Sequence, residues 1–232
     1  MKLPRLWSAL GPALALAGAS LLGGCGGEVI SPQPLFGAKD AATREAPRAG
    51  WWVMVSPEEA CGIDLAKPTG QWPDCARPVL LSGRMAGKLT VSEGEGDAVG
   101  IDYLLAAGEP MILQASLSSP PGDSGGYTYH VLRPTRRDAR GRPVEIAVWP
   151  VLCGPPAPRA PSGRGGAGVT AAPWPSVEMS GGGCRVRDLD GLRDAARRSE
   201  SLSGGAPLTV RWLRERRAGD QTDDQWLAKA MQ

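Results

Sequence analysis

Histidine and large aromatic residues other than tryptophan are scarce in this chain of 232 residues. The single histidine, His130, excludes a zinc site that needs two imidazole ligands. One Phe and three Tyr, against eight Trp, leave tryptophan as the main source of large side chains. The chain instead contains 32 Gly and 22 Pro, about twice the usual share of these two residues. This excess predicts many turns and loops and excludes a helical bundle.

An uncharged stretch rich in Ala and Leu lies close to the start of the chain. Lys2 and Arg5 precede it, and it covers residues 6–22. One proline and two glycines interrupt it, so it is a poor membrane-spanning helix and is typical of the apolar region of an export signal. It ends in Leu-Gly-Gly-Cys, with the cysteine at Cys25.

This order of charge, apolar run, small residues and cysteine resembles the lipobox signal of bacterial lipoproteins over residues 1–25. The resemblance implies removal of a signal peptide at 1–24. It also implies a lipid anchor at Cys25, with diacylglycerol on the sulfur and an acyl chain such as palmitate on the amino group. Two glycines and no Asp follow Cys25, which in this family implies the periplasmic face of the outer membrane. An ordinary secretory signal, with Cys25 in a disulfide, is the alternative.

Charge is balanced overall but divided between two halves of the exported chain. Without residues 1–24 the chain has 24 basic and 24 acidic side chains, which disfavours a nucleic-acid partner. Residues 26–130 carry a net charge of −6 and residues 131–232 one of +6. An arginine cluster in the basic half is a candidate contact for an anionic lipid headgroup or an acidic protein: Arg133, Arg136, Arg137, Arg140 and Arg142. A solvated face with no specific partner is the alternative.

Four cysteines remain in the exported chain, in a compartment that favours disulfides. Sequence order predicts the pairs Cys61–Cys75 and Cys153–Cys184, each closing a loop rich in Pro and Gly. The other connectivities and a four-cysteine metal site remain alternatives. Since no pair has the C-x-x-C spacing of zinc or redox sites, we expect no metal and no cofactor.

Short β-favouring segments separated by turns dominate the chain after residue 50. Strands are expected at 51–55, 78–82, 88–92, 99–105, 111–117, 127–133, 143–152 and 208–213. The segments 127–133 and 143–152 alternate in polarity around a polar loop, which predicts a β-hairpin. Several tryptophans are expected in the core rather than as exposed sugar-binding platforms: Trp51 or Trp52, Trp149 and Trp212.

Two short helices are expected near the C-terminus, one capped by Asp188 and one from Asp223 or Asp224 to Met231. With the strands they predict a mainly β fold, an antiparallel sandwich or barrel-like sheet with the helices at one end. The expected parts are a lipidated flexible tether at 25–49, a β domain at 50–153, a Pro/Gly-rich linker or surface loop at 154–176, and a helix–strand–helix extension packing on the β domain at 177–232.

One segment, residues 122–126, reads Gly-Asp-Ser-Gly-Gly and resembles the nucleophile segment of trypsin-like serine proteases. Glycines in such a segment expose backbone N–H groups to an oxyanion. The family's histidine lies upstream of its serine, whereas His130 lies six residues after Ser124. A turn between two strands explains the same residues, and a Ser124–His130 dyad without an identified carboxylate remains a hypothesis.

The sequence therefore favours a periplasmic lipoprotein, anchored to the membrane, that acts as a non-enzymatic structural or binding module of the bacterial envelope. A periplasmic serine hydrolase that uses Ser124 and His130 is the second hypothesis. No residue is assigned a catalytic role.

Overall fold

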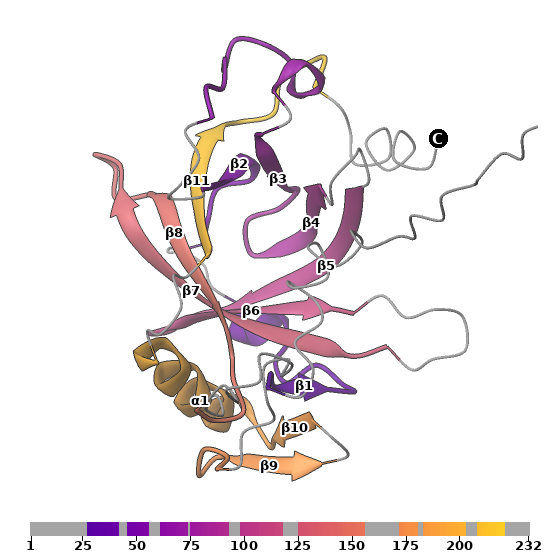
Figure 1. The fold of residues 1–232 in the computed structure, drawn as a ribbon, viewed down its shortest axis with the longest axis vertical. Helices are drawn as coiled ribbons and strands as arrows, with labels where there is room; N and C mark the ends of the chain where they lie inside the picture. The colour runs from indigo at the N-terminus through magenta and orange to yellow at the C-terminus, as the bar shows by residue number, and fades with distance from the viewer. Residues whose placement is uncertain are drawn as a thin grey trace, which may run out of the picture.

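The computed structural model describes residues 27–41, 46–55, 61–73, 75–92, 98–117, 125–155, 172–180, 183–202 and 208–220. In these residues the chain is mainly β, with one α-helix, α1 (Leu189–Ser201), and two short 3-10 turns (Figure 1). The strands are β1 (Ile30–Ser31), β2 (Gly50–Val55), β3 (Arg77–Leu81), β4 (Ala86–Ser92), β5 (Ala98–Ala106), β6 (Met111–Ser116), β7 (Tyr127–Arg137), β8 (Pro143–Pro150), β9 (Val177–Ser180), β10 (Gly183–Val186) and β11 (Leu208–Arg214).

Eight of these strands form a closed antiparallel barrel. Strands β2 to β8 follow one another as a meander in which each strand pairs with the next. Strand β11 then inserts between β8 and β2, so that every barrel strand has a neighbour on both sides. Closure removes the two edges that an open meander would leave unpaired. The mainly β antiparallel fold is confirmed, and it is a barrel rather than a sandwich.

Apolar side chains from around the barrel fill its interior. Because successive residues of a strand point to opposite faces, every second side chain points into the barrel. On β7, Leu132 points into the barrel, whereas its neighbour Val131 packs on the outside. The buried members of the inner cluster are Ala46, Trp52, Val79, Leu81, Val91, Ile101, Tyr103, Leu105, Met111, Leu113, Ala115, Leu132 and Ile146.

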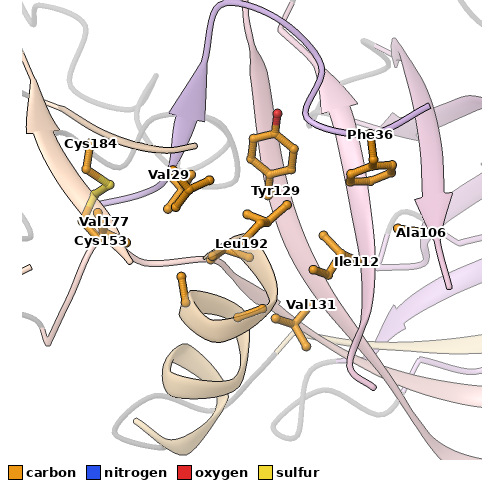
Figure 2. Packing of buried hydrophobic residues seen from close by; sticks show 14 residues of the cluster. Val29, Phe36, Ala106, Ile112, Tyr129, Val131, Cys153, Val177, Cys184 and Leu192 are labelled. Atoms are coloured by element: carbon orange, nitrogen blue, oxygen red, sulfur yellow. A yellow bond between two sulfur atoms is a disulfide. The ribbon is translucent and has the colours of Figure 1, made fainter. Parts of the chain in front are cut away.

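A second apolar cluster lies on the outer side of the barrel, beneath α1 and beside β1 and β10 (Figure 2). Helix α1 begins after Asp188, as predicted, and the Asp188 carboxylate accepts the N–H of Gly191 at 2.8 Å. Leu192 of α1 is fully buried in the cluster that contains Tyr129 and Val131 of β7. Strands β9 and β10 form a small two-stranded ribbon at the lower end of the molecule in Figure 1, and a parallel bridge from Cys184 to Val29 connects it to the segment that leads into β1.

A third cluster is formed where the loop between β2 and β3 folds back over the outside of both strands. Trp51 and Leu80 are fully buried, and Trp72 of the loop is 9% exposed. The rings of Trp51 and Trp72 meet edge to face, with their centroids 5.8 Å apart. The prediction that Trp51 or Trp52 lies in the core is confirmed for both, while Trp149 and Trp212 are partly buried against the clusters.

The prediction of a flexible tether at 25–49 is wrong for the described residues of that segment. Strand β1 pairs with the start of β7, and Val29 and Phe36 are 0% and 5% exposed. The hydroxyl groups of Ser31 and Tyr129 are 2.5 Å apart and hydrogen-bonded. Burial of these apolar side chains against the barrel outweighs the flexibility suggested by the small residues and prolines around them.

The C-terminal region also differs from the prediction. Strand β11 belongs to the barrel, because it pairs with the edges of β2 and β8 that would otherwise be unpaired. The region 177–232 is therefore not an extension that packs on a separate β domain. Residues 177–180 and 183–186 form the unpredicted ribbon of β9 and β10. The second predicted helix lies outside the described residues, as does 156–171 of the predicted linker.

Candidate functional site

The five arginines predicted to contact an anion all belong to the β7–β8 hairpin, which projects from the barrel (Figure 1). Arg133 forms an ion pair with Glu200 of α1, with Nη2 and Oε2 2.7 Å apart. Arg136 lies 3.7 Å from the carboxylate of Glu145 on β8. Since these two arginine side chains remain 56% and 58% exposed, both can reach a ligand while paired.

Asp138 organises the tip of the hairpin. Its carboxylate accepts the backbone N–H groups of Arg140 and Arg142, and also the side-chain Nε–H of Arg142 at 2.9 Å. The hydrogen bond from the Arg142 backbone is the largest cause that lowers the pKa of Asp138. Arg142 is thus matched by a carboxylate, whereas the side chains of Arg137 and Arg140 have no carboxylate partner within the described part of the chain.

Glu145 brings a further arginine to this surface from β11. The carboxylate of Glu145 accepts the Thr135 hydroxyl at 3.1 Å and lies 3.3 Å from Nε of Arg211. The register of β8 and β11 places Arg211 directly opposite Glu145. We call the exposed arginines here the hairpin basic surface: Arg133, Arg136, Arg137, Arg140 and Arg211.

Arg48, which sequence reasoning missed, lies beneath the hairpin. Its guanidinium carbon stands 4.2 Å from the ring centroid of Trp212, and Nη2 lies 3.7 Å from Asp138. Burial is the main cause that lowers the pKa of Arg48, followed by the charge of Arg142. The contact joins the tip of the hairpin to the barrel through a cation–π interaction. No charge cluster in the sequence marked this isolated arginine.

His130, the one candidate catalytic base, lies on the inward face of β7 with Leu132. Leu113 and Pro150 are its register partners on the neighbouring strands. Burial lowers the pKa of His130 to about 4, so the imidazole is neutral near pH 7. Among the described residues it hydrogen-bonds only to the Thr128 hydroxyl, at 3.5 Å, and no carboxylate orients it. Ser124 lies outside the described residues.

Both predicted disulfides are confirmed, Cys61–Cys75 and Cys153–Cys184, each with a Cα–Cα distance of 5.8 Å. Cys25 lies outside the described residues, which begin two positions later at Gly27. In that described portion we find no group of three His, Cys, Asp or Glu side chains that could hold a metal ion. Its helix is also not long and apolar enough to cross a membrane.

A buried ion pair, Arg214–Asp220, was also missed by sequence reasoning. The guanidinium donates to both carboxylate oxygens, at 2.6 and 2.7 Å, and to the Lys67 carbonyl at 3.2 Å. The indole N–H of Trp51 donates to the same carboxylate at 3.2 Å. The side chains of Arg214 and Asp220 are 7% and 2% exposed. This network fastens the Cys61–Cys75 loop to β11, so Arg214 is structural and not part of the basic surface.

No family model, curated protein or solved structure matches this chain.

Proposed function

We propose that the protein is a lipid-anchored, non-enzymatic binding module at the periplasmic face of the outer membrane. Cys25 is its anchor, and the hairpin basic surface binds an acidic partner. One observation carries this proposal: Gly27 and the arginine-rich tip lie at opposite ends of β7 and β8. The Gly27 carbonyl accepts the N–H of Cys153, just after β8, whereas the tip follows the far end of β7. Eleven extended residues separate these ends by about 30 Å.

The same geometry selects the kind of partner. A lipid on Cys25 holds the Gly27 end at the membrane, so the tip with Arg137 and Arg140 is directed away from it. Headgroups of the anchoring membrane are then out of reach of these side chains, since surface charges act over about one Debye length of 8 Å. An acidic protein surface in the periplasm is the partner that fits, because exposed guanidinium groups recognise carboxylates.

Lipidation at Cys25 is tested by metabolic labelling with a palmitate analogue. The wild-type protein is expected to take up label. It is also expected to fractionate with membranes, because several acyl chains together hold a protein stably in a bilayer. Cys25→Ser is expected to lose the label completely. A Cys25→Ser protein that still carries label would overturn the proposed anchor.

The acidic-partner proposal is tested with poly-L-glutamate as the probe, by titration at low and at physiological salt. The double variant Arg137→Glu/Arg140→Glu is expected to bind about tenfold more weakly than wild type. Two ion pairs with carboxylates of the probe are lost, and the introduced glutamates repel the probe. The matched control, Arg77→Glu/Arg84→Glu, reverses two exposed arginines on the opposite part of the barrel sheet. Equal losses in both variants would show that net charge, and not the hairpin, governs binding.

A further inference from the structure

Three charged side chains line up across the adjacent strands β7, β8 and β11, close to the tip of the hairpin. The strand register places Arg136 and Arg211 opposite Glu145, one on each side of it. Ile146, the next residue of β8, is buried in the interior of the barrel, so Glu145 points to the outer face. Two arginines from two different strands therefore flank one carboxylate.

A β-bulge in β7 adds a hydroxyl group to this arrangement. The register of β7 on β8 shifts between Pro134, which pairs with Ile146, and Arg136, which pairs with Glu145. Thr135 is the extra residue, and a bulge lets two residues of one strand face one residue of the neighbouring strand. The Thr135 hydroxyl accordingly donates to Oε1 of Glu145 at 3.1 Å.

The two guanidinium groups converge on the other oxygen of the Glu145 carboxylate. Nη2 of Arg136 lies 3.7 Å from Oε2, and Nε of Arg211 lies 3.3 Å from the same atom. A guanidinium carries several N–H donors, and neither arginine has another partner among the described residues. The side chains of Arg136 and Arg211 are 58% and 48% exposed, so their unused donors are open to solvent.

Two positive groups that share one carboxylate keep the capacity to bind another. We propose that Arg136 and Arg211 together bind one carboxylate of the acidic partner, and that Glu145 is the internal carboxylate that occupies them in the free protein. Guanidinium groups already held side by side lose less side-chain freedom when they bind a carboxylate. This inference rests on the proposed function, and it places the partner along the outer face of β7, β8 and β11.

A double-mutant cycle measures whether one carboxylate uses both arginines. Wild-type full-length protein, Arg136→Gln, Arg211→Gln and the double variant are titrated with hexa-L-glutamate. Each single variant is expected to bind about fivefold more weakly, because an exposed ion pair is lost. The double variant should lose much less than the about 25-fold expected of independent contacts, because the second arginine contributes little once the shared contact is broken.

Arg140→Gln supplies the matched control for the cycle. Arg140 is an exposed arginine of the hairpin tip that has no contact with Glu145 in the described part of the chain. Combined with Arg211→Gln, it should give losses that multiply. Losses that also multiply for Arg136 and Arg211 would overturn the shared site. A wild-type protein that binds no hexa-L-glutamate would instead refute the proposed function itself.

Competition by Glu145 gives the site a second test. Glu145→Gln keeps the shape of the side chain and frees both guanidinium groups, so hexa-L-glutamate is expected to bind about threefold more tightly. The matched control is Glu178→Gln, which removes the same charge from an exposed glutamate that is also paired with an arginine, but on β9 at the lower end of the molecule (Figure 1). Since exposed charges are screened beyond about 8 Å, this control should leave the affinity unchanged. Equal affinities of the two variants would overturn the assignment of Glu145 as the internal occupant.

Discussion

Replacing Arg214 by alanine is expected to lower the free energy of unfolding by about 3–5 kcal/mol. Arg214 and Asp220 are almost completely buried, so the variant leaves an uncompensated carboxylate and frees the Lys67 carbonyl. The Trp51–Trp72 contact beside them depends on the same attachment of the loop. Chemical denaturation followed by tryptophan fluorescence measures the change.

Arg211→Ala is the matched control, three residues earlier on the same strand. Arg211 is 48% exposed and, in the part of the chain that the structure describes, pairs only with Glu145, so its loss should cost at most about 1 kcal/mol. Similar losses of unfolding free energy in the two variants would show that the buried pair stabilises the fold no more than the exposed pair does.

The pH dependence of the same pair has a definite sign. Burial raises the pKa of Asp220, but the hydrogen bonds from Arg214, the Arg217 backbone and Trp51, with the Arg214 charge, lower it to about 2. The folded state thus releases this proton more readily than the unfolded state, and the ion pair contributes on the order of 2 kcal/mol above pH 5. That contribution is lost as the pH falls through 4 toward 2, so the stability gap between wild type and Arg214→Ala should narrow over this range.

Removing the Cys153–Cys184 disulfide with the double variant Cys153→Ala/Cys184→Ala is expected to cost about 3–4 kcal/mol. The bridge closes a sequence separation of 31 residues and connects the end of β8 to β10. Both cysteines are buried in the outer cluster, and Val29 packs beside them. Thermal and chemical unfolding measure the loss.

The Cys61–Cys75 double variant provides the comparison for this prediction. Its separation of 14 residues should give a loss of about 3 kcal/mol, slightly smaller than that of the longer bridge. Proteolysis distinguishes the two, because loss of Cys153–Cys184 should expose β9, β10 and β1 first. If β9, β10 and β1 stay protected from proteolysis in the Cys153→Ala/Cys184→Ala variant, packing without the disulfide is enough to hold these strands in place.

Much of the barrel could be predicted because its strands are short, alternating and separated by turn residues. The alternation of the segments 127–133 and 143–152 predicted the hairpin that β7 and β8 form. The helix that begins after Asp188 and both disulfides were also predicted, since caps and cysteine order are local signals.

The missed elements depend on distant parts of the chain. The segment that contains Val29 and Phe36 has a composition typical of a linker. It is ordered because these two side chains pack against the outer surface of β6 and β7. Likewise β11 is a barrel strand because β2 and β8 need a partner, a requirement that no local pattern encodes.

The candidate site was only partly predictable for the same reason. The arginines of the β7–β8 loop form a cluster in the sequence, so they were identified. Contacts within the folded loop divide them: Arg142 pairs with Asp138, whereas the exposed side chain of Arg140 has no carboxylate partner among the described residues. In the sequence Arg214 is one of four arginines within 211–217. Only its burial with Asp220 distinguishes it from the exposed Arg211.

On the proposed function, a lipid on Cys25 holds the Gly27 end of the barrel to a membrane. The most direct measurement is the intact mass, with N-terminal fragmentation, of the mature protein extracted from membranes. The predicted result is a chain that begins at Cys25 and carries diacylglycerol on its sulfur and an acyl chain on its amino group. A mature chain that begins elsewhere, or that carries Cys25 without acyl chains, would contradict it.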